Sequence, residues 1–309
     1  RKFCRFSPVR ENKIGINMRV KFENFWGGFP VHDNIVTVAL NLRHDVEIVN
    51  SNPDLIVNQG PRSHKDNNAM TISWFIESMN RIGEPNYDNC DYSFNSCNLD
   101  DYRNYRIPFW ATQINWNGAP THDINRGPTY YISPEELYHR DIYHRQRLCC
   151  SVASGTLGKR ADFYPKISER FNVVHGGDFL RNTGEMVKKP GNSDYLEKIE
   201  FISKFKSNLC FENDPRDGYV CEKILHAFYA GCLPIYWGPK DVGDDFNKGA
   251  FIDISDFISD EEAINHIQEV LIDDSKLLSY LQEPVFPDGA IPYHATPESL
   301  SDFFEKAGI

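Results

Sequence analysis

Alternation of short apolar segments with segments of helical periodicity is the feature of this chain that most constrains its fold. The pattern is clearest in the second half. The predicted strands there are Leu148–Ala153, Val173–His175, Asn208–Phe211, Leu233–Trp237 and Phe251–Ile254. The predicted helices are Gly158–Arg170, Tyr195–Phe205, Tyr219–Ala230, Glu261–Leu271, Lys276–Leu281 and Ser299–Ala307. This alternation is typical of an α/β protein with a doubly wound parallel sheet, which binds ligands beyond the carboxyl ends of its strands.

The first half is less regular. Its predicted strands are Lys13–Phe22, Val46–Val49, Leu55–Val57 and Thr71–Ile76, and the polar stretch 86–104 is predicted to be a long loop. A chain of 309 residues suits two domains. We place the boundary so that the N-terminal domain spans residues 1–147 and the C-terminal domain spans residues 148–309. The final helix is a candidate to pack back on the N-terminal domain.

Composition argues against several classes of function. The formal net charge of −11 disfavours a nucleic-acid-binding surface. No apolar run approaches the roughly 20 residues of a membrane helix. The chain begins at Arg1 rather than Met, so an anchor for peripheral membrane association could lie in a missing segment. None of the eight cysteines forms a CxxC pair, which favours buried free thiols and a reducing, cytoplasmic compartment, although Cys90 and Cys97 could pair if the compartment were oxidising.

The stretch Cys210–His226 carries the strongest sign of a binding site. A strand is followed by the turn Asp214–Gly218, and a helix is predicted to begin at Tyr219. On that helix one polar face would hold Tyr219, Glu222, Lys223 and His226. The positive end of the helix, reinforced by Lys223, suits a phosphate, while Glu222 suits a ribose or sugar hydroxyl. The alternative is a solvated helix start with a surface Glu–Lys pair.

A second loop adds two cations. Residues 151–160, SVASGTLGKR, form a strand, a glycine-containing loop and a helix opened by Lys159 and Arg160. A nucleotide-binding P-loop is excluded because the glycine spacing is too short and the hydroxyl after the lysine is missing. Arg160 could hold a diphosphate without a metal, or it could be an ordinary surface arginine. No clustered cysteine and histidine ligands predict a metal site.

These residues lead to a family resemblance. The runs NLCFEN (208–213), GYVCEKI (218–224) and LPIYWG (233–238) resemble the donor-site signature of the α1,3/1,4-fucosyltransferases of glycosyltransferase family 10, with the bacterial members the most similar. The similarity extends through HGG (175–177), SVAS (151–154) and KRADFY (159–164), and forward to DFN (245–247) and FIDI (251–254). In the first half it thins to NFWG (24–27), DLIV (54–57) and FIES (75–78).

The resemblance implies a fold, a donor and a set of site residues. The fold would be GT-B, in which two Rossmann-like domains face a cleft. The donor would be GDP-β-L-fucose, bound by the C-terminal domain without a cofactor or metal. Arg160 and Lys223 would hold the diphosphate, Tyr219 the nucleotide, and Glu222 the ribose or fucose. The matched motifs add these donor-binding residues: Glu212, Asn213, Gly176 and Gly177.

The same resemblance implies inverting transfer of L-fucose to a hydroxyl of an N-acetylglucosamine-containing glycan, in α1,3 or α1,4 linkage. The general base would be Glu77, with Glu84 as its rival. Trp26 and Phe29 are candidates to stack on the oligosaccharide acceptor, although aromatic side chains more often simply pack. Two alternatives stay open: a related transferase that uses another GDP-sugar, and a glycan- or nucleotide-binding protein without turnover.

Overall fold

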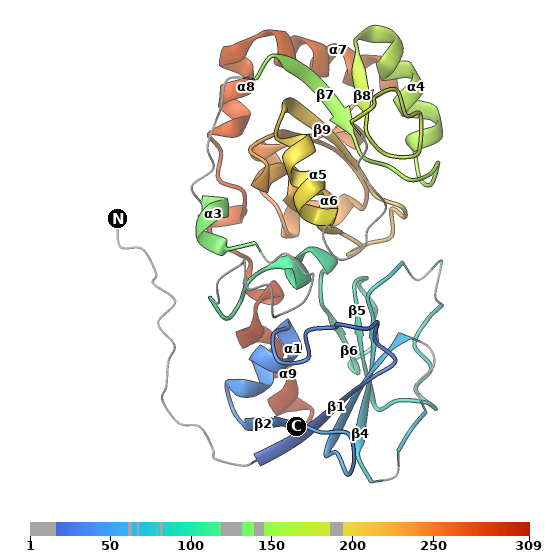
Figure 1. The fold of residues 1–309 in the computed structure, drawn as a ribbon, viewed down its shortest axis with the longest axis vertical. Helices are drawn as coiled ribbons and strands as arrows, with labels where there is room; N and C mark the ends of the chain where they lie inside the picture. The colour runs from blue at the N-terminus through green and yellow to red at the C-terminus, as the bar shows by residue number, and fades with distance from the viewer. Residues whose placement is uncertain are drawn as a thin grey trace.

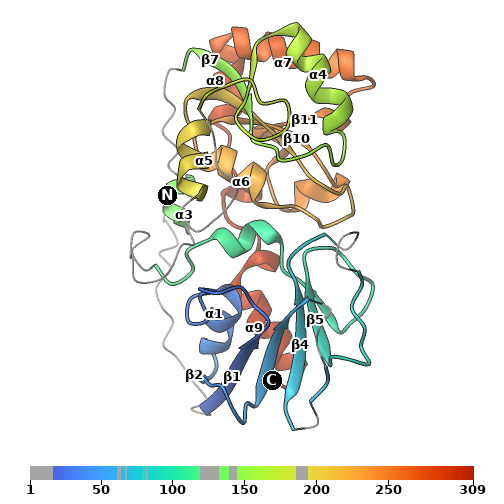
Figure 2. The ribbon, with the colours of Figure 1, turned by 45° about the vertical axis from the view of Figure 1, so that its right-hand side comes forward.

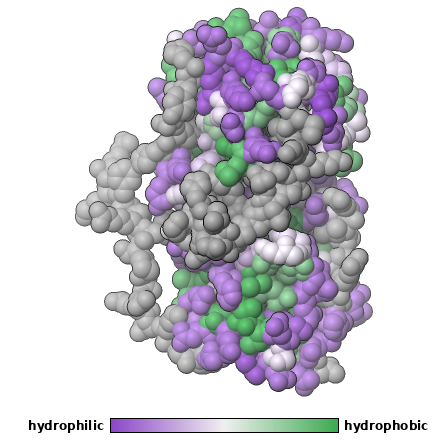
Figure 3. Space-filling model, viewed as in Figure 1, coloured by the Kyte–Doolittle hydropathy of each residue, from purple (hydrophilic) through white to green (hydrophobic). Residues whose placement is uncertain are grey.

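A computed structural model describes residues 17–60, 64–66, 68–78, 80, 83–118, 132–138, 145–185 and 194–309. The described residues form two lobes, each built on a parallel sheet (Figure 1, Figure 2). On the face drawn in Figure 3, hydrophilic residues cover much of the described surface of both lobes. No helix in the described part of the chain is long and apolar enough to cross a membrane.

The first lobe contains a sheet with the strand order β2-β1-β3-β4-β5-β6, and each neighbouring pair is parallel. Its strands are β1 (Asn17–Glu23), β2 (Asp45–Ile48), β3 (Leu55–Gln59), β4 (Met70–Phe75), β5 (Tyr92–Asn95) and β6 (Asn104–Arg106). Helix α1 (Ile35–Asn41) is capped by the side chain of Asn34, which accepts hydrogen bonds from two backbone N–H groups. The carboxyl ends of these strands point toward the second lobe (Figure 2).

The second lobe contains a parallel sheet with the order β11-β10-β9-β7-β8. Its strands are β7 (Arg147–Ser151), β8 (Val173–His175), β9 (Phe205–Phe211), β10 (Leu233–Trp237) and β11 (Ile252–Asp253). Its helices are α4 (Arg160–Arg170), α5 (Asp194–Ile202), α6 (Glu222–Tyr229), α7 (Asp260–Ile272) and α8 (Asp274–Leu281). The predicted C-cap glycine is confirmed, because Gly231 follows α6 with a φ of 70°.

Short helical segments lie between and beside the lobes. They are α3 (Pro134–Tyr138), η2 (Phe109–Gln113), η3 (Lys240–Asp244), η4 (Lys248–Ala250), η5 (Ile254–Asp256), η6 (Pro287–Gly289) and η7 (Tyr293–Ala295). Trp110 of η2 is fully buried and packs against Phe246 and Phe286 of the second lobe, with ring centroids 5.1 and 5.5 Å away. The two lobes therefore share a continuous hydrophobic core.

Helix α9 (Pro297–Lys306) comes after the second lobe in the sequence but lies in the first, beside α1 (Figure 1). Its Phe304 packs against Phe94 of β5 with ring centroids 5.9 Å apart. Arg43, just beyond α1, donates hydrogen bonds to Ser301 and Asp302 of α9. The first lobe is thus completed by a segment from the opposite end of the described chain.

The first half is more regular than its sequence suggested. The stretch 86–104, predicted to be a loop, contains β5 and the start of β6, and α1 was not predicted. Cys90 and Cys97 lie within this stretch as buried free thiols and form no disulfide. Residues 13–16 of the predicted first strand lie outside the described residues.

Candidate active site

The helix that follows the Asp214–Gly218 turn begins later than predicted. Helix α6 starts at Glu222, with Cys221 as its N-cap. Tyr219 is 2% exposed, and its backbone N–H donates a hydrogen bond to the backbone carbonyl of Arg216 within the turn. The prediction that Tyr219 shares a helical face with Glu222 and Lys223 is therefore wrong, because the backbone is still turning at Tyr219.

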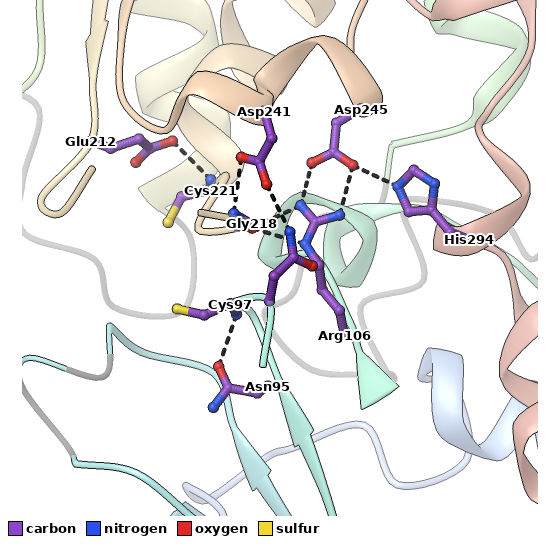
Figure 4. Close-up of polar contacts among 10 residues, drawn as sticks. Asn95, Cys97, Arg106, Glu212, Gly218, Cys221, Asp241, Asp245 and His294 are labelled. Atoms are coloured by element: carbon purple, nitrogen blue, oxygen red, sulfur yellow. Dashed lines mark hydrogen bonds and ion pairs between the residues drawn. The ribbon is translucent and has the colours of Figure 1, made fainter. Parts of the chain in front are cut away.

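Glu212 organises the start of α6. It follows the carboxyl end of β9, and its side chain is fully buried. Its Oε1 accepts a hydrogen bond from the Cys221 backbone N–H at 2.8 Å (Figure 4), and its Oε2 accepts one from Lys223 Nζ at 2.7 Å. Glu212 thus satisfies the backbone N–H of the N-cap residue, while the Cys221 side chain makes no capping hydrogen bond.

Lys223 is held in place rather than free in solvent, because its side chain is only 19% exposed. Burial opposes its charge, but the surrounding acidic groups, Glu212 and Glu222 among them, raise its pKa well above the ordinary value. An ammonium has three N–H donors, and Glu212 uses one of them at hydrogen-bond distance. The alternative of a solvated surface Glu–Lys pair does not fit this burial.

Glu222 is flanked by two lysines. Its carboxylate oxygens lie 3.4 Å from Lys198 Nζ and 4.0 Å from Lys223 Nζ. Burial opposes ionisation of Glu222, but Lys223, Lys198 and the neighbouring histidine outweigh it and hold its pKa below the usual range. Lys198 was missed by the sequence analysis, because it lies on α5 outside every motif and only the fold brings it to α6.

Arg160 opens α4, as predicted, but its side chain is 4% exposed and so is not on the surface. Its Nη2 donates a hydrogen bond to the Phe211 carbonyl, one residue before Glu212. Its Nε has no hydrogen-bond partner among the described residues. A buried guanidinium with an unused N–H is costly unless an anion completes its hydrogen bonding. Arg160 and Lys223 are therefore anchored to adjacent residues at the carboxyl end of β9.

Gly176 and Gly177, which the family resemblance implied as donor-binding residues, pack closely against neighbouring residues in the structure. A Cβ atom at Gly177 would lie 2.3 Å from the Ala153 carbonyl oxygen, and one at Gly176 would lie 2.7 Å from the Phe201 ring. Both glycines allow the loop after β8 to approach its neighbours closely. Asn213 is half-buried beside Glu212.

Both candidate bases border the Asp214–Gly218 turn. Glu77 is exposed and follows the carboxyl end of β4, and its neighbour Ser78 donates a hydrogen bond to Asp214 Oδ2 at 2.6 Å. Glu84 is 74% exposed and lies 3.6 Å from the Arg216 guanidinium. The structure therefore places carboxylates of the first lobe beside the turn that leads into α6.

The two predicted acceptor-binding aromatics differ in exposure. Trp26 is 45% exposed, whereas Phe29 is half-buried. Phe29 stacks on Phe25 with ring centroids 4.0 Å apart and supports Trp26 edge-on at 5.1 Å. Both follow β1, at the same sheet edge as Glu77. Trp26 thus presents its indole on a rigid aromatic base, while Phe29 packs beneath it.

Within the described residues, no group of three or more histidine, cysteine or acidic side chains could hold a metal ion. The polar groups gathered at the junction are instead paired cations and carboxylates. Two Rossmann-like lobes, each built on a parallel sheet, with such a cluster between them form the GT-B architecture.

Comparison with known proteins shows which family and which solved structures the chain is similar to. Residues 142–283 match the model described as glycosyltransferase family 10 (fucosyltransferase) C-terminal domain. The solved structure of an α1,3-fucosyltransferase with GDP-fucose has a TM-score of 0.70 and 25% identity, and the match covers 96% of this chain and 91% of that one. The same type of enzyme with GDP gives a TM-score of 0.71. The C-terminal part of the chain is therefore similar to the fucosyltransferases of glycosyltransferase family 10.

Two relatives support this assignment. The α-(1,3)-fucosyltransferase FucT of Helicobacter pylori is 26% identical over 300 residues, which cover 86% of this chain and 60% of that protein. The putative fucosyltransferase R654 of Acanthamoeba polyphaga mimivirus is 31% identical over 103 residues, covering 33% of this chain and 17% of that protein. The chain therefore spans less than two thirds of the length of these relatives.

Proposed function

We propose that the chain is an inverting fucosyltransferase that moves L-fucose from GDP-β-L-fucose to a hydroxyl of an N-acetylglucosamine-containing glycan, in α1,3 or α1,4 linkage. The observation that carries the proposal is a pair of cations at the carboxyl end of β9, the buried Arg160 and the partly buried Lys223. They occur in a chain similar to a fucosyltransferase solved with GDP-fucose. No metal is required in this proposal, because the two cations take the place of one.

The diphosphate is proposed to lie against the start of α6. The Arg160 Nε is unpaired among the described residues, and Lys223 keeps N–H donors beyond the one given to Glu212. As the bond to fucose breaks, negative charge grows on the leaving GDP. Cations fixed before the reaction stabilise that charge more in the transition state than in the ground state.

The sugar ring gains positive charge in the same step. Glu222 is held ionised by Lys198 and Lys223 and can stabilise that charge or accept hydrogen bonds from sugar hydroxyls. Tyr219 is buried next to this cluster and contributes the wall of the donor pocket rather than a surface contact.

The acceptor hydroxyl is a weak nucleophile and needs a base. Glu77 is proposed to take its proton as the oxygen attacks C1 of fucose from the face opposite GDP, which inverts the anomeric carbon. Trp26 is proposed to stack on a sugar ring of the acceptor. Both residues follow the carboxyl ends of strands in the first sheet, β1 for Trp26 and β4 for Glu77.

The test is to incubate the purified chain with GDP-fucose and a panel of disaccharides, and to determine product mass and linkage. GDP-mannose in parallel assays distinguishes a transferase for another GDP-sugar. Lys223→Ala and Arg160→Ala should abolish transfer. Lys248→Ala is the matched control, because Lys248 also pairs with a buried carboxylate, Asp253, at 2.8 Å but lies elsewhere in the second lobe. Failure of the wild-type chain to bind GDP would refute the proposal.

A further inference from the structure

The first lobe makes hydrogen bonds to the turn that precedes α6. This turn, residues 214–218, is called the donor turn below, because it connects Glu212 to Tyr219 and the start of α6. Ser78 Oγ, after β4, donates to Asp214 Oδ2 at 2.6 Å. The backbone N–H of Asn98, after β5, donates to the Asp217 carbonyl at 2.9 Å. Both ends of the donor turn therefore contact the first lobe.

Arg106 makes the most extensive of these contacts. It is the last residue of β6, and its Nε and Nη2 donate to the Gly218 carbonyl at 3.0 and 2.7 Å. Its Nη1 and Nη2 also bond both oxygens of Asp245, at 2.9 and 2.5 Å (Figure 4). Asp245 is fully buried and accepts a further bond from His294 Nε2 at 2.7 Å. The guanidinium thus joins the donor turn to a buried carboxylate of the second lobe.

The backbone N–H of Gly218 is also hydrogen-bonded. Asp241 Oδ1 accepts from the Gly218 N–H at 3.0 Å, and its Oδ2 accepts from Asn98 Nδ2 at 2.7 Å (Figure 4). The N–H and the carbonyl of Gly218 are therefore both bonded, one through Asp241 and one through Arg106.

Only glycine permits this arrangement. Gly218 has a φ of +83°, and a Cβ there would lie 2.6 Å from the Asn98 backbone nitrogen and 2.8 Å from Arg106 Nε. The first lobe is packed directly on the backbone of the donor turn. Any change in the relative position of the lobes must therefore move the turn or break these bonds.

We propose that Arg106, although it belongs to the acceptor lobe, is a positioning residue for the donor site. It holds the donor turn in the conformation that places Tyr219 and the start of α6. A turn that is already ordered loses less conformational freedom when the nucleotide binds, so the affinity for GDP is higher. This inference rests on the proposed function.

The test is GDP binding by titration calorimetry, with thermal unfolding of the same samples. Arg106→Lys keeps a positive charge beside Asp245 but cannot bond Gly218 and Asp245 with one planar fork. We expect its Kd for GDP to rise about tenfold, with a higher KM for GDP-fucose and a smaller change in kcat. Arg43→Lys is the matched control, because Arg43 also pairs with carboxylates, Asp302 and Glu305, but both lie on α9 and not at the donor turn. It should bind GDP like the wild type.

Two further variants keep the proposal open to refutation if Arg106→Lys folds poorly. Asn98→Ala removes only an exposed side chain from Asp241 and should raise the Kd for GDP about threefold, as expected for one hydrogen bond. Gly218→Ala should weaken GDP binding more than Gly289→Ala, which has a similar φ of +72° but only a distant neighbour, at 4.0 Å.

The outcomes separate the two proposals. If the wild type does not bind GDP, the proposed function fails and this inference fails with it. If the wild type binds GDP and the Arg106, Asn98 and Gly218 variants bind it equally well, only the positioning role is refuted. If Arg43→Lys and Arg106→Lys weaken GDP binding equally, the positioning role of Arg106 is also refuted, because the effect would then be general destabilisation of the fold.

Discussion

Replacing Lys223 with methionine should have two separable effects. The first is structural, because the Glu212 carboxylate is fully buried and would lose its cation while keeping only the Cys221 N–H. Leaving one member of a buried ion pair alone costs about 3–5 kcal/mol. We take the lower end, about 3 kcal/mol, because Lys223 is 19% exposed. An unfolding entropy of about 2.1 cal/mol/K per residue over 309 residues then gives a fall in Tm of about 5 °C.

The second effect is on donor binding. A hydrogen bond to a charged group is worth about 1.5–3 kcal/mol. If Lys223 contacts the diphosphate, its loss should therefore raise the Kd for GDP about 10- to 140-fold. The measurement is titration calorimetry with GDP, well below the unfolding temperature, with calorimetric unfolding of the same samples.

A double variant separates the two roles. In Glu212→Gln/Lys223→Met, the glutamine oxygen can still accept from the Cys221 N–H, and residue 212 no longer carries a buried charge. Removing both members of a pair is close to neutral, so most of the lost Tm should return. GDP affinity should stay low when compared with Glu212→Gln alone, a comparison that cancels the lost repulsion between Glu212 and the diphosphate. If the double variant regains both stability and affinity, Lys223 serves only to neutralise Glu212 and the proposed donor site is wrong.

Three further predictions concern the rest of the site. Glu77→Gln should lose transfer while keeping GDP binding, and Glu84→Gln should remain active; the reverse result in product assays would assign the base to Glu84. Trp26→Ala should raise the acceptor KM about tenfold, the loss expected for one stacked ring, and Trp26→Phe should restore part of it; unchanged acceptor kinetics would count against stacking. Burial opposes ionisation of Asp245, but the charge of Arg106 and the hydrogen bonds from His294 and Arg106 lower its pKa from the ordinary 3.8. The ionised Asp245 therefore stabilises the fold above pH 3.8, and this stabilisation is lost as the pH falls below that value. Asp245→Asn should flatten the dependence of the unfolding free energy on pH below about 4. An unchanged slope would exclude Asp245 as the source of that pH dependence.

The second lobe was predictable because its strands are continuous apolar runs bounded by turn residues. The bounds of β8 and β10 match the prediction residue for residue. The start of α6 was not predictable from local pattern. The N–H of its N-cap residue, Cys221, donates to Glu212, which lies before the Asp214–Gly218 turn. A contact over that separation leaves no local sequence signal.

The first lobe was harder because its strands are short and partly polar. In β5 the buried Ser93 bonds both Tyr87 and Asn104 through its hydroxyl, at 2.9 and 2.8 Å. Buried polar side chains that are satisfied in this way make a strand look like a polar loop in sequence. Lys198 and Arg106 were missed for a related reason, since neither lies in a motif and each gains its role from a contact made across the fold.

Helix α9 has a consequence for the order in which the protein is built. Domains generally fold as they leave the ribosome, from the N-terminus onward. Here the sheet that is synthesised first lacks the helix carrying Phe304 until the whole other lobe has been made. Part of the apolar face of the β1–β6 sheet therefore stays exposed until α9 has been synthesised. A fragment that stops before residue 297 should aggregate or bind chaperones instead of folding alone.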